Sequence, residues 1–148
     1  MDTLLKAIQT AIKTAPTMDY LKGSVEIIPE GPDDDVLPSE AKFPLVGITD
    51  GAESIEHLPG KKKETFREVR ISGYEEIMRP ERAIVGDDVN RGVIKIIKDA
   101  QAVLEHNLLN LPGYTIARSV SVEASTVVPL ANLLAAKKTI IFRYKARL

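Results

Sequence analysis

The 148-residue chain contains no cysteine and no tryptophan. The lack of cysteine excludes disulfide bonds, thiolate metal sites and a cysteine nucleophile. No apolar run approaches the roughly 20 residues that a membrane-spanning helix needs. The opening stretch MDTLLKAIQTAIKTAP carries an early acidic residue and scattered polar residues, unlike a signal peptide. We therefore expect a soluble protein without a membrane segment.

An excess of charge of one sign is also lacking. The chain has 20 Lys and Arg residues against 21 Asp and Glu residues, a formal net charge of −1. A protein dedicated to duplex DNA is usually more basic, because its affinity depends on phosphate neutralisation and counterion release. Balanced charge disfavours DNA binding as the main function but allows a local basic patch. With 44% hydrophobic residues the chain can bury one core, so we expect a single domain over 1–148.

Motifs for nucleotide binding and catalysis are missing. The P-loop pattern G-x-x-x-x-G-K-[ST] fails at Gly60-Lys61, because Ile55 and Lys62 occupy the positions of its first glycine and its Ser/Thr. The patterns G-x-G-x-x-G, G-x-S-x-G and H-E-x-x-H do not occur. We therefore expect no enzymatic activity, no catalytic residues and no cofactor.

Candidate metal ligands are few and poorly spaced. His57 and His106 are the only histidines, and neither has the further ligands that a metal site needs nearby. The aspartates at 33–35 do not alternate as calcium ligands do, so we interpret 29–42 as a solvated acidic loop. The aspartates at 87–88 suit the start of a helix, where they would cap free amides. We expect no metal site.

Hydrophobic periodicity predicts two helices. Apolar residues at helical spacing from Leu4 to Ala15 predict an N-terminal helix. A second set from Val93 to Leu111 predicts a helix of roughly 20 residues that starts near Val89 and ends at the Pro112-Gly113 pair.

Strands are predicted around 25–28, 44–49, 67–74, 116–124 and 139–148. The last one, TIIFRYKARL, has one apolar face and one basic face, as expected for a strand with one face on a core. The segment 125–138 before it is predicted as an apolar arm, too long for a tight hairpin. The order predicts an α+β fold: a mostly antiparallel sheet of about four to five strands, with the N-terminal helix and the long helix packed on one face.

Three groups of residues are candidates for binding. The basic face of the last strand has two interpretations: solvated charge that opposes unwanted edge pairing, or a contact with another subunit or an anionic partner. The apolar arm either packs on its own core or docks on a neighbouring subunit. The lysines after Pro59-Gly60 form a solvated turn, a subunit contact or a DNA contact. The three groups comprise Arg143, Lys145 and Arg147; Val127, Val128, Leu130, Leu133 and Leu134; and Lys61, Lys62 and Lys63.

The order of elements resembles that of a known class of virion proteins. The pieces that carry it are FPLVGITDGAES, ETFREVRISGYEE, the helix from Val89 to Asn110 and the basic ending IIFRYKARL. Together they resemble the tail terminator and tail-completion proteins of tailed bacteriophages, and the related neck proteins that join head to tail. The similarity is one of layout over nearly the whole chain, without a diagnostic motif.

The resemblance implies a structural, non-enzymatic subunit. Such subunits form a homo-oligomeric ring, typically hexameric, that caps the tail tube, stops its polymerisation and provides the docking surface for the neck or head connector. The implied partners are further copies of the chain, the tail tube protein, the neck or connector protein and the sheath protein. Genomic DNA passes through the lumen without specific binding, and the protein belongs to the virion tail or neck after assembly in the host cytoplasm.

Two alternatives stand beside the terminator. The first is another head–tail joining or neck protein. The second is a small nucleic-acid-binding module that uses Lys61–Lys63 and the basic C-terminal strand. In a ring, the two sides of each subunit contact must differ, and the apolar arm and the basic strand are candidates for such a pair. The lysine turn would then face the lumen or a neighbouring subunit.

Overall fold

The structure, a computed structural model, describes residues 3–21, 24–28, 42–77, 84–85, 92–130 and 133–146, with the main chain alone at Leu130 and Leu133. Its helices are α1 (Thr3–Thr14), the 3-10 helix η1 (Pro16–Leu21) and α3 (Val93–Leu104). Its strands are β1 (Val25–Ile27), β2 (Leu45–Leu58), β3 (Lys62–Glu76), β4 (Tyr114–Val122), β5 (Thr126–Leu130) and β6 (Leu133–Ala146). The predicted α+β class is confirmed.

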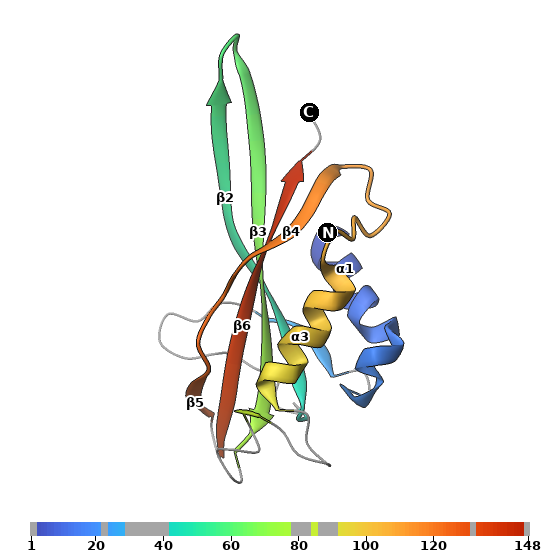
Figure 1. Cartoon of the computed structure of the whole chain (residues 1–148), viewed down its shortest axis with the longest axis vertical. Helices are drawn as coiled ribbons and strands as arrows, with labels where there is room; N and C mark the ends of the chain where they lie inside the picture. Colours follow the sequence, from blue (N-terminus) through green and yellow to red (C-terminus); the bar gives the residue numbers. More distant parts are fainter. Residues whose placement is uncertain are drawn as a thin grey trace.

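The strands form one twisted sheet with the helices on one side (Figure 1). The strand order is β1-β2-β3-β6-β4, and β5 pairs with β6 beyond the end of β4. Among the described strands only β1 and β2 run parallel, so the sheet is mostly antiparallel, as predicted. The described sheet has six strands, slightly more than the four to five expected.

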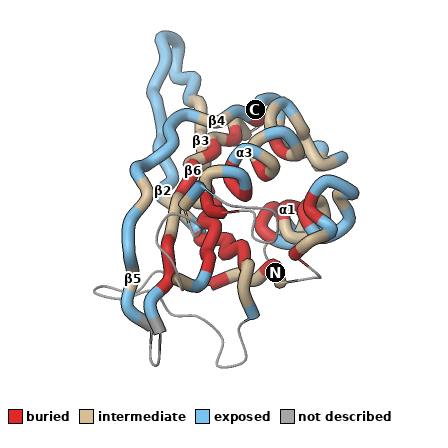
Figure 2. Tube along the Cα trace, turned by 60° about the horizontal axis from the view of Figure 1, so that its bottom comes forward, coloured by how far each residue is buried: buried red, intermediate tan, exposed pale blue. Residues whose placement is uncertain are grey.

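The main core lies between the helices and the facing side of the sheet. The apolar stripe of α1 is buried as its periodicity predicts, and α3 buries a similar stripe. From the sheet, alternate residues of β3 and β6 meet these helices, which Figure 2 shows as buried segments beneath α1 and α3. The central members are Ile8, Ile12, Val69, Ile71, Ile96, Ile140, Phe142 and Tyr144.

A glycine allows α3 to approach the sheet closely. A Cβ atom at Gly73 of β3 would lie 2.7 Å from the side chain of Ile96 on α3. No ordinary side chain fits this space, because interiors are packed to the density of organic crystals. Gly73 therefore sets the distance between the helix layer and the sheet.

A smaller apolar cluster covers one end of the opposite face. Ile28, Leu45 and Tyr74 are buried there, with Phe43 and Val128 packed against them. Tyr74 alternates with Gly73 along β3 and therefore points away from α3. The sheet is thus covered by helices on one face and by a local cluster on the other.

The helix α3 is shorter than predicted, because the chain turns toward β4 before the Pro112-Gly113 pair. It ends at Leu104, where Glu105 is extended and His106 has a φ of 56°. The amide of His106 donates a hydrogen bond of 2.9 Å to the carbonyl of Ala117. Contact with β4 thus replaces further helical hydrogen bonds. The helix begins after Gly92, and the aspartates at 87–88 lie outside the described residues.

The interpretation of 125–138 as a long arm without a tight hairpin is wrong. Thr126 pairs with Lys137 and Leu130 with Leu133, so β5 and β6 form a hairpin with a two-residue connection. The β-branched residues of this stretch favour a strand, and its apolar character, unusual for a loop, was itself a strand signal. Together β4 and β5 run alongside nearly the whole of β6.

Two register shifts interrupt the regular alternation of side chains along β4. The shifts occur between Tyr114 and Ile116 and between Ser119 and Ser121. Each inserts an extra residue and reverses the face on which later side chains lie. Ala117 faces the core and is buried, whereas Ile116, Val120 and Val122 are exposed.

Candidate interaction surfaces

The most prominent feature outside the core is a two-stranded arm. We define the arm as residues 54–66, the distal part of the β2–β3 hairpin. Its outermost contact with a third strand is the pair Phe66–Lys145 with β6. Beyond it, four cross-strand pairs from Ile55–Thr65 to Leu58–Lys62 have no third strand among the described residues. At strand rise these pairs project roughly 13 Å from the sheet, as Figure 1 shows.

A bulge begins the arm. Asp50 pairs with Val69 but Glu53 pairs with Arg67, so β2 has one residue more than β3 in this interval. A Cβ atom at Gly51 would lie 2.6 Å from the carbonyl oxygen of Glu68, so this position requires a residue without a side chain. The bulge places Ile55 on the helix side of the sheet and Leu58 on the opposite side.

The base of the arm is held by the basic face of β6. The Arg143 guanidinium stacks on the Phe66 ring, with its central carbon 4.0 Å from the ring centre, and also lies 3.3 Å from the Glu56 carboxylate. The Lys145 ammonium lies 2.7 Å from the Glu64 carboxylate. Both acidic residues of the arm thus form an ion pair with a cation of β6. We call this group the clamp; it consists of Glu56, Glu64, Phe66, Arg143 and Lys145.

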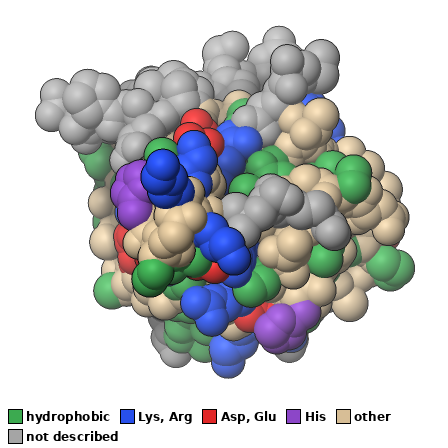
Figure 3. Space-filling model, turned by 90° about the horizontal axis from the view of Figure 1, so that it is seen from above, with side chains coloured by type: hydrophobic (Ala, Val, Ile, Leu, Met, Phe, Trp, Pro, Cys, Tyr) green, Lys and Arg blue, Asp and Glu red, His purple; other side chains and the backbone are tan. Residues whose placement is uncertain are grey.

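The tip of the arm carries unbalanced positive charge. Lys61, Lys62 and Lys63 are exposed and form no ion pair within the described residues. Lys61 has a φ of 64°, in the left-handed region of the turn. Seen from the end that carries the arm, the molecule shows Lys and Arg side chains gathered across its surface (Figure 3). Both acidic residues of the arm, Glu56 and Glu64, pair with the clamp and not with the tip lysines.

The arm also exposes apolar side chains on both of its faces. Ile55 is 55% exposed and Leu58 is 37% exposed. The tube in Figure 2 is exposed along nearly the whole arm. A two-stranded hairpin in water is only marginally stable by itself. These exposed side chains are therefore available to a partner without any change in the core.

The opposite end of the sheet carries the second surface. Figure 1 places β5 and the start of β6 far from the tip of the arm. Val127 is 55% exposed and Leu134 is 51% exposed there, whereas Val128 packs against the Tyr74 cluster. We call the β5–β6 hairpin with the side chains of Val127 and Leu134 the β5 end.

The predicted site residues therefore divide between these two ends. Lys61–Lys63 lie at the tip, and Arg143 and Lys145 at the base of the arm. Leu130 and Leu133 pair with each other at the β5 end, but their side chains and Arg147 lie outside the described part of the chain. Their proposed roles in subunit contacts stay predictions. The sequence predicts that the basic face of the last strand is either solvated or in contact with another subunit or an anionic partner; in the structure, Arg143 and Lys145 pair with Glu56 and Glu64 of the arm.

The backbone groups on the outer edges of the sheet are partly satisfied from within the chain. On β4, the carbonyl of Ala117 accepts from His106 and the amide of Ser119 donates to the Glu105 carboxylate at 3.2 Å. On β1, the carbonyl of Val25 accepts from the Gln9 side chain at 2.8 Å. These contacts protect the edges against pairing with another strand.

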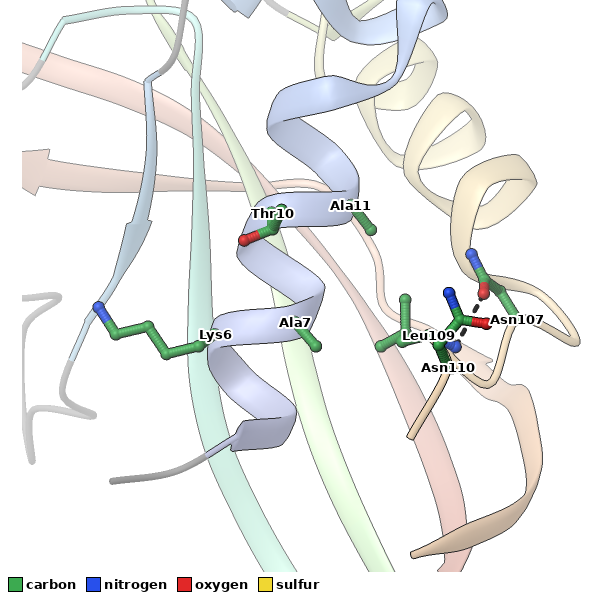
Figure 4. A pocket seen from close by; sticks show the side chains of 7 residues that line it. All are labelled: Lys6, Ala7, Thr10, Ala11, Asn107, Leu109 and Asn110. Carbon is green, nitrogen blue, oxygen red and sulfur yellow. Dashed lines mark hydrogen bonds between the residues drawn. The ribbon is translucent and has the colours of Figure 1, made fainter. Parts of the chain in front are cut away.

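A shallow groove lies between α1 and the loop after α3 (Figure 4). Its open volume is about 420 Å³, and its wall is formed by Lys6, Ala7, Thr10, Ala11, Asn107, Leu109 and Asn110. The Asn107 side chain accepts from the amide of Leu109 at 2.9 Å, which orders the loop. Lys6 is the one ionisable lining residue, so the groove lacks a pair of groups for acid–base chemistry.

No group of three or more His, Asp and Glu side chains within the described ranges is placed to hold a metal ion. His57 is exposed near the tip of the arm, and His106 is exposed in the loop after α3 rather than within the helix. Among the described helices, none is long and apolar enough to cross a membrane.

Sequence reasoning missed Ile55, Leu58 and Phe66 as surface or clamp residues. The weak signal for the arm was the Pro59-Gly60 turn between two stretches of similar length. The segment GAESIEHL is too polar for its alternation to stand out. Strand pairing, rather than burial, makes it part of β2.

Comparison with known proteins gives a likeness of fold. No protein-family model and no curated protein matches the chain. A solved structure described as the virion of a native gene transfer agent (GTA) particle contains a chain of similar fold, with a TM-score of 0.54 and 14% identity. The match covers 97% of this chain and 93% of that chain. The likeness thus extends over nearly the full length of both chains, and it is a likeness of fold.

Proposed function

We propose that this chain is a structural subunit of a phage-like virion. The observation that carries the proposal is the fold shared, over almost its whole length, with a chain of a gene transfer agent particle. An elongated subunit with exposed apolar side chains at both of its ends suits such an assembly, because each copy must contact others. The groove between α1 and the loop after α3 offers no competing catalytic arrangement.

Within the virion, the function that we propose is tail termination. Copies of the chain form a closed ring, typically of six, on the last ring of the tail tube. The ring ends polymerisation and presents the docking surface for the neck or head connector. Its partners are further copies, the tube protein and the neck protein, with the sheath in contractile tails, and DNA passes through its lumen. Another head–tail joining protein is the nearest alternative within this class.

Tail assembly with and without the protein tests this function. We expect tubes assembled without it to be overlong and variable in length, and tubes assembled with it to have a narrow length distribution. Negative-stain electron microscopy measures both distributions and locates the protein on the tube. Identical distributions, or protein scattered along the tube, would contradict tail termination.

The lysine tip favours one candidate from another class, a small nucleic-acid-binding module. Lys61–Lys63 are exposed at the end where basic side chains gather. The engagement of Arg143 and Lys145 with the arm's own acidic residues counts against it, since a phosphate would compete with Glu56 and Glu64. We therefore rank this candidate second.

A further inference from the structure

We propose that residues 105–111 are a conformational switch, which changes between the loop that follows α3 and an extension of that helix. The inference goes beyond tail termination and does not depend on it. Three observations carry it: the strained backbone of the loop, the helical pattern of its sequence, and the equal lengths of the extended helix and the neighbouring part of β4.

The loop holds three residues other than glycine at positive φ. The φ angles are 56° at His106, 57° at Leu109 and 58° at Asn110. For residues with a Cβ atom this region is costly, and it is normally visited by single residues rather than by two in a row. The loop therefore stores backbone strain that a right-handed helix would release.

The sequence of the same stretch has the pattern of a helix. Leu108 and Leu111 continue the apolar stripe of α3 beyond Leu104, at helical spacings of four and three residues. The segment 105–111 contains neither proline nor glycine, and the Pro112-Gly113 pair after it marks a helix end. Residues 105–111 therefore suit a longer α3 as well as the loop.

The hydrogen bonds of the loop take the place of helical ones. The Asn107 side chain donates at 3.0 Å to the carbonyl of Val103, which is the acceptor that the Asn107 amide would use in a helix. The amide of His106 donates to the carbonyl of Ala117 on β4, and the amide of Leu109 donates to the Asn107 side chain. In the extended helix these amides would donate to carbonyls four residues earlier. Each of them thus has a partner in either state, as a two-state element requires.

The extended helix fits beside β4. The helix α3 and the strand β4 run in opposite directions (Figure 1), and the bond from His106 places the end of the helix beside Ala117. From Ala117 back to Tyr114, where β4 begins, the distance is about 10 Å at strand rise. The seven residues 105–111 also span about 10 Å as a helix. The Pro112-Gly113 pair can then connect the helix to Tyr114 without a change in β4.

The switch moves one leucine between the core and the surface. In the loop, Leu109 is half-buried and packs against the main core. In the helix it would follow Leu104 by five residues and would lie away from the apolar stripe. Burial of Leu109 favours the loop, and relief of backbone strain favours the helix. These two effects are of the same order, so neither state is excluded by the other.

The loop form shapes two grooves on the surface. Asn107, Leu109 and Asn110 line both the groove beside α1, with an open volume of about 420 Å³ (Figure 4), and a second one toward Tyr114 of about 450 Å³. Both walls change when these residues join the helix. The switch therefore alters the surface beside α1 and leaves the sheet in place.

Matched substitutions at two exposed positions of the loop test the proposal. His106 and Asn110 are exposed, so their replacement removes no core packing. One variant combines His106→Ala with Asn110→Ala, and its control combines His106→Gly with Asn110→Gly. Glycine tolerates positive φ and favours the loop, whereas alanine has the higher helix propensity. The ratio of helix to loop is expected to differ about tenfold per position between the two variants.

Nuclear magnetic resonance measures the conformation of the segment. We expect the Cα chemical shifts of residues 105–111 to move toward helical values in the alanine variant and to keep loop values in the glycine variant. The shifts of β3 and β6 are expected to be equal in both, which shows that the fold is kept. In the parent chain, saturation-transfer experiments are expected to detect a minor state with helical Cα shifts in this segment and to lose it in the glycine variant.

The proposal is overturned if the alanine variant keeps loop shifts over 105–111, or if both variants change alike. Random-coil shifts in the alanine variant would also overturn it, because release of strain would then melt the segment rather than extend α3. If the alanine variant does not fold, the parent chain decides: a minor helical state supports the switch, and its absence overturns it.

Discussion

The guanidinium of Arg143 lies between the ring of Phe66 and the carboxylate of Glu56, and so connects the last strand of the sheet to both strands of the arm. The central carbon of the guanidinium lies 4.0 Å from the ring centre and the ion pair spans 3.3 Å, and the same guanidinium donates to the hydroxyl of Ser54 at 3.4 Å. The basic face of β6, which the sequence alone leaves open to an external anion, therefore supports the arm. Substitution of Arg143 is expected to have measurable consequences.

Arg143→Ala is expected to destabilise the protein by about 1 kcal/mol, because it removes a cation–π contact and a partly exposed ion pair. Arg143→Lys is expected to lie between the parent and Arg143→Ala, since it keeps the charge but loses the planar stacking. Urea denaturation measures both values. Amide hydrogen exchange over residues 54–65 is expected to accelerate in Arg143→Ala, and unchanged exchange there would argue against the clamp.

Gly73→Ala is expected to cost about 1–3 kcal/mol, because the new methyl group overlaps Ile96 at 2.7 Å and must push α3 from the sheet. Gly113→Ala is the matched control: nothing lies within 4 Å of a Cβ atom there, and the change is expected to be neutral or slightly stabilising. Thermal unfolding of the two variants tests the comparison. Equal effects at both glycines would refute close packing of α3 on β3.

The buried hydroxyls of Ser72 and Thr139 lie 2.8 Å apart on neighbouring strands. Ser72→Ala or Thr139→Val alone leaves the other hydroxyl buried without its partner, which costs about 1–3 kcal/mol. The double substitution removes both polar groups and is expected to cost less than the sum of the single ones. A double-mutant cycle by denaturant unfolding gives the coupling, and strict additivity would contradict it.

The hydroxyl of Tyr144 is buried and has no hydrogen-bond partner within the described residues. Burial, and then the neighbouring charges of Glu105 and Tyr114, raise the pKa of Tyr144 well above its ordinary value of 10.0. The folded state therefore keeps a proton that the unfolded state releases above about pH 10, so stability falls as the pH rises through this range.

Tyr144→Phe removes the titrating hydroxyl group. At about pH 8 we expect the variant to match or slightly exceed the parent in stability, because the lost hydroxyl made no hydrogen bond there. At about pH 11 the variant is expected to be clearly more stable than the parent. Guanidinium denaturation at the two pH values tests this, and a parallel decline of both proteins would contradict it.

Duplex DNA is expected to bind weakly, with no measurable affinity at about 0.15 M salt. Fluorescence anisotropy with the parent and with Lys61→Ala, Lys62→Ala and Lys63→Ala combined provides the measurement. Binding at this salt concentration that is lost in the triple variant would favour the nucleic-acid-binding module over the virion subunit.

The sequence predicts the parts of this fold whose burial leaves a periodic trace. The stripe of α1 and the alternation of Ile140, Phe142 and Tyr144 in β6 are confirmed because one face of each element meets the core. The length of β2 could not be predicted from the sequence, because the side chains of the arm are mostly exposed and leave no hydrophobic pattern. Pairing with β3 alone defines this part of the strand. At the early end of α3, the Glu105 carboxylate accepts from the amide of Ser119 and the amide of His106 donates to the carbonyl of Ala117; both are contacts between distant parts of the chain.

The candidate surfaces were predicted only in part. Lys61–Lys63 and Val127 were identified by charge and apolar character, and both are exposed. The engagement of Arg143 and Lys145 was not predictable, because it requires the bulge at Gly51 to place Glu56 beside Arg143 and the β3–β6 register to place Glu64 beside Lys145. Strand pairing thus decides whether that strand face is open or occupied.

The protected edges of the sheet have a consequence for how the molecule behaves when it is abundant. Because Gln9 closes the β1 side and Glu105 with His106 closes the β4 side, strands from other copies find no unsatisfied backbone groups at these positions. Addition of a strand from another copy at these positions of β1 and β4 is therefore disfavoured, because it would have to break a contact within the chain.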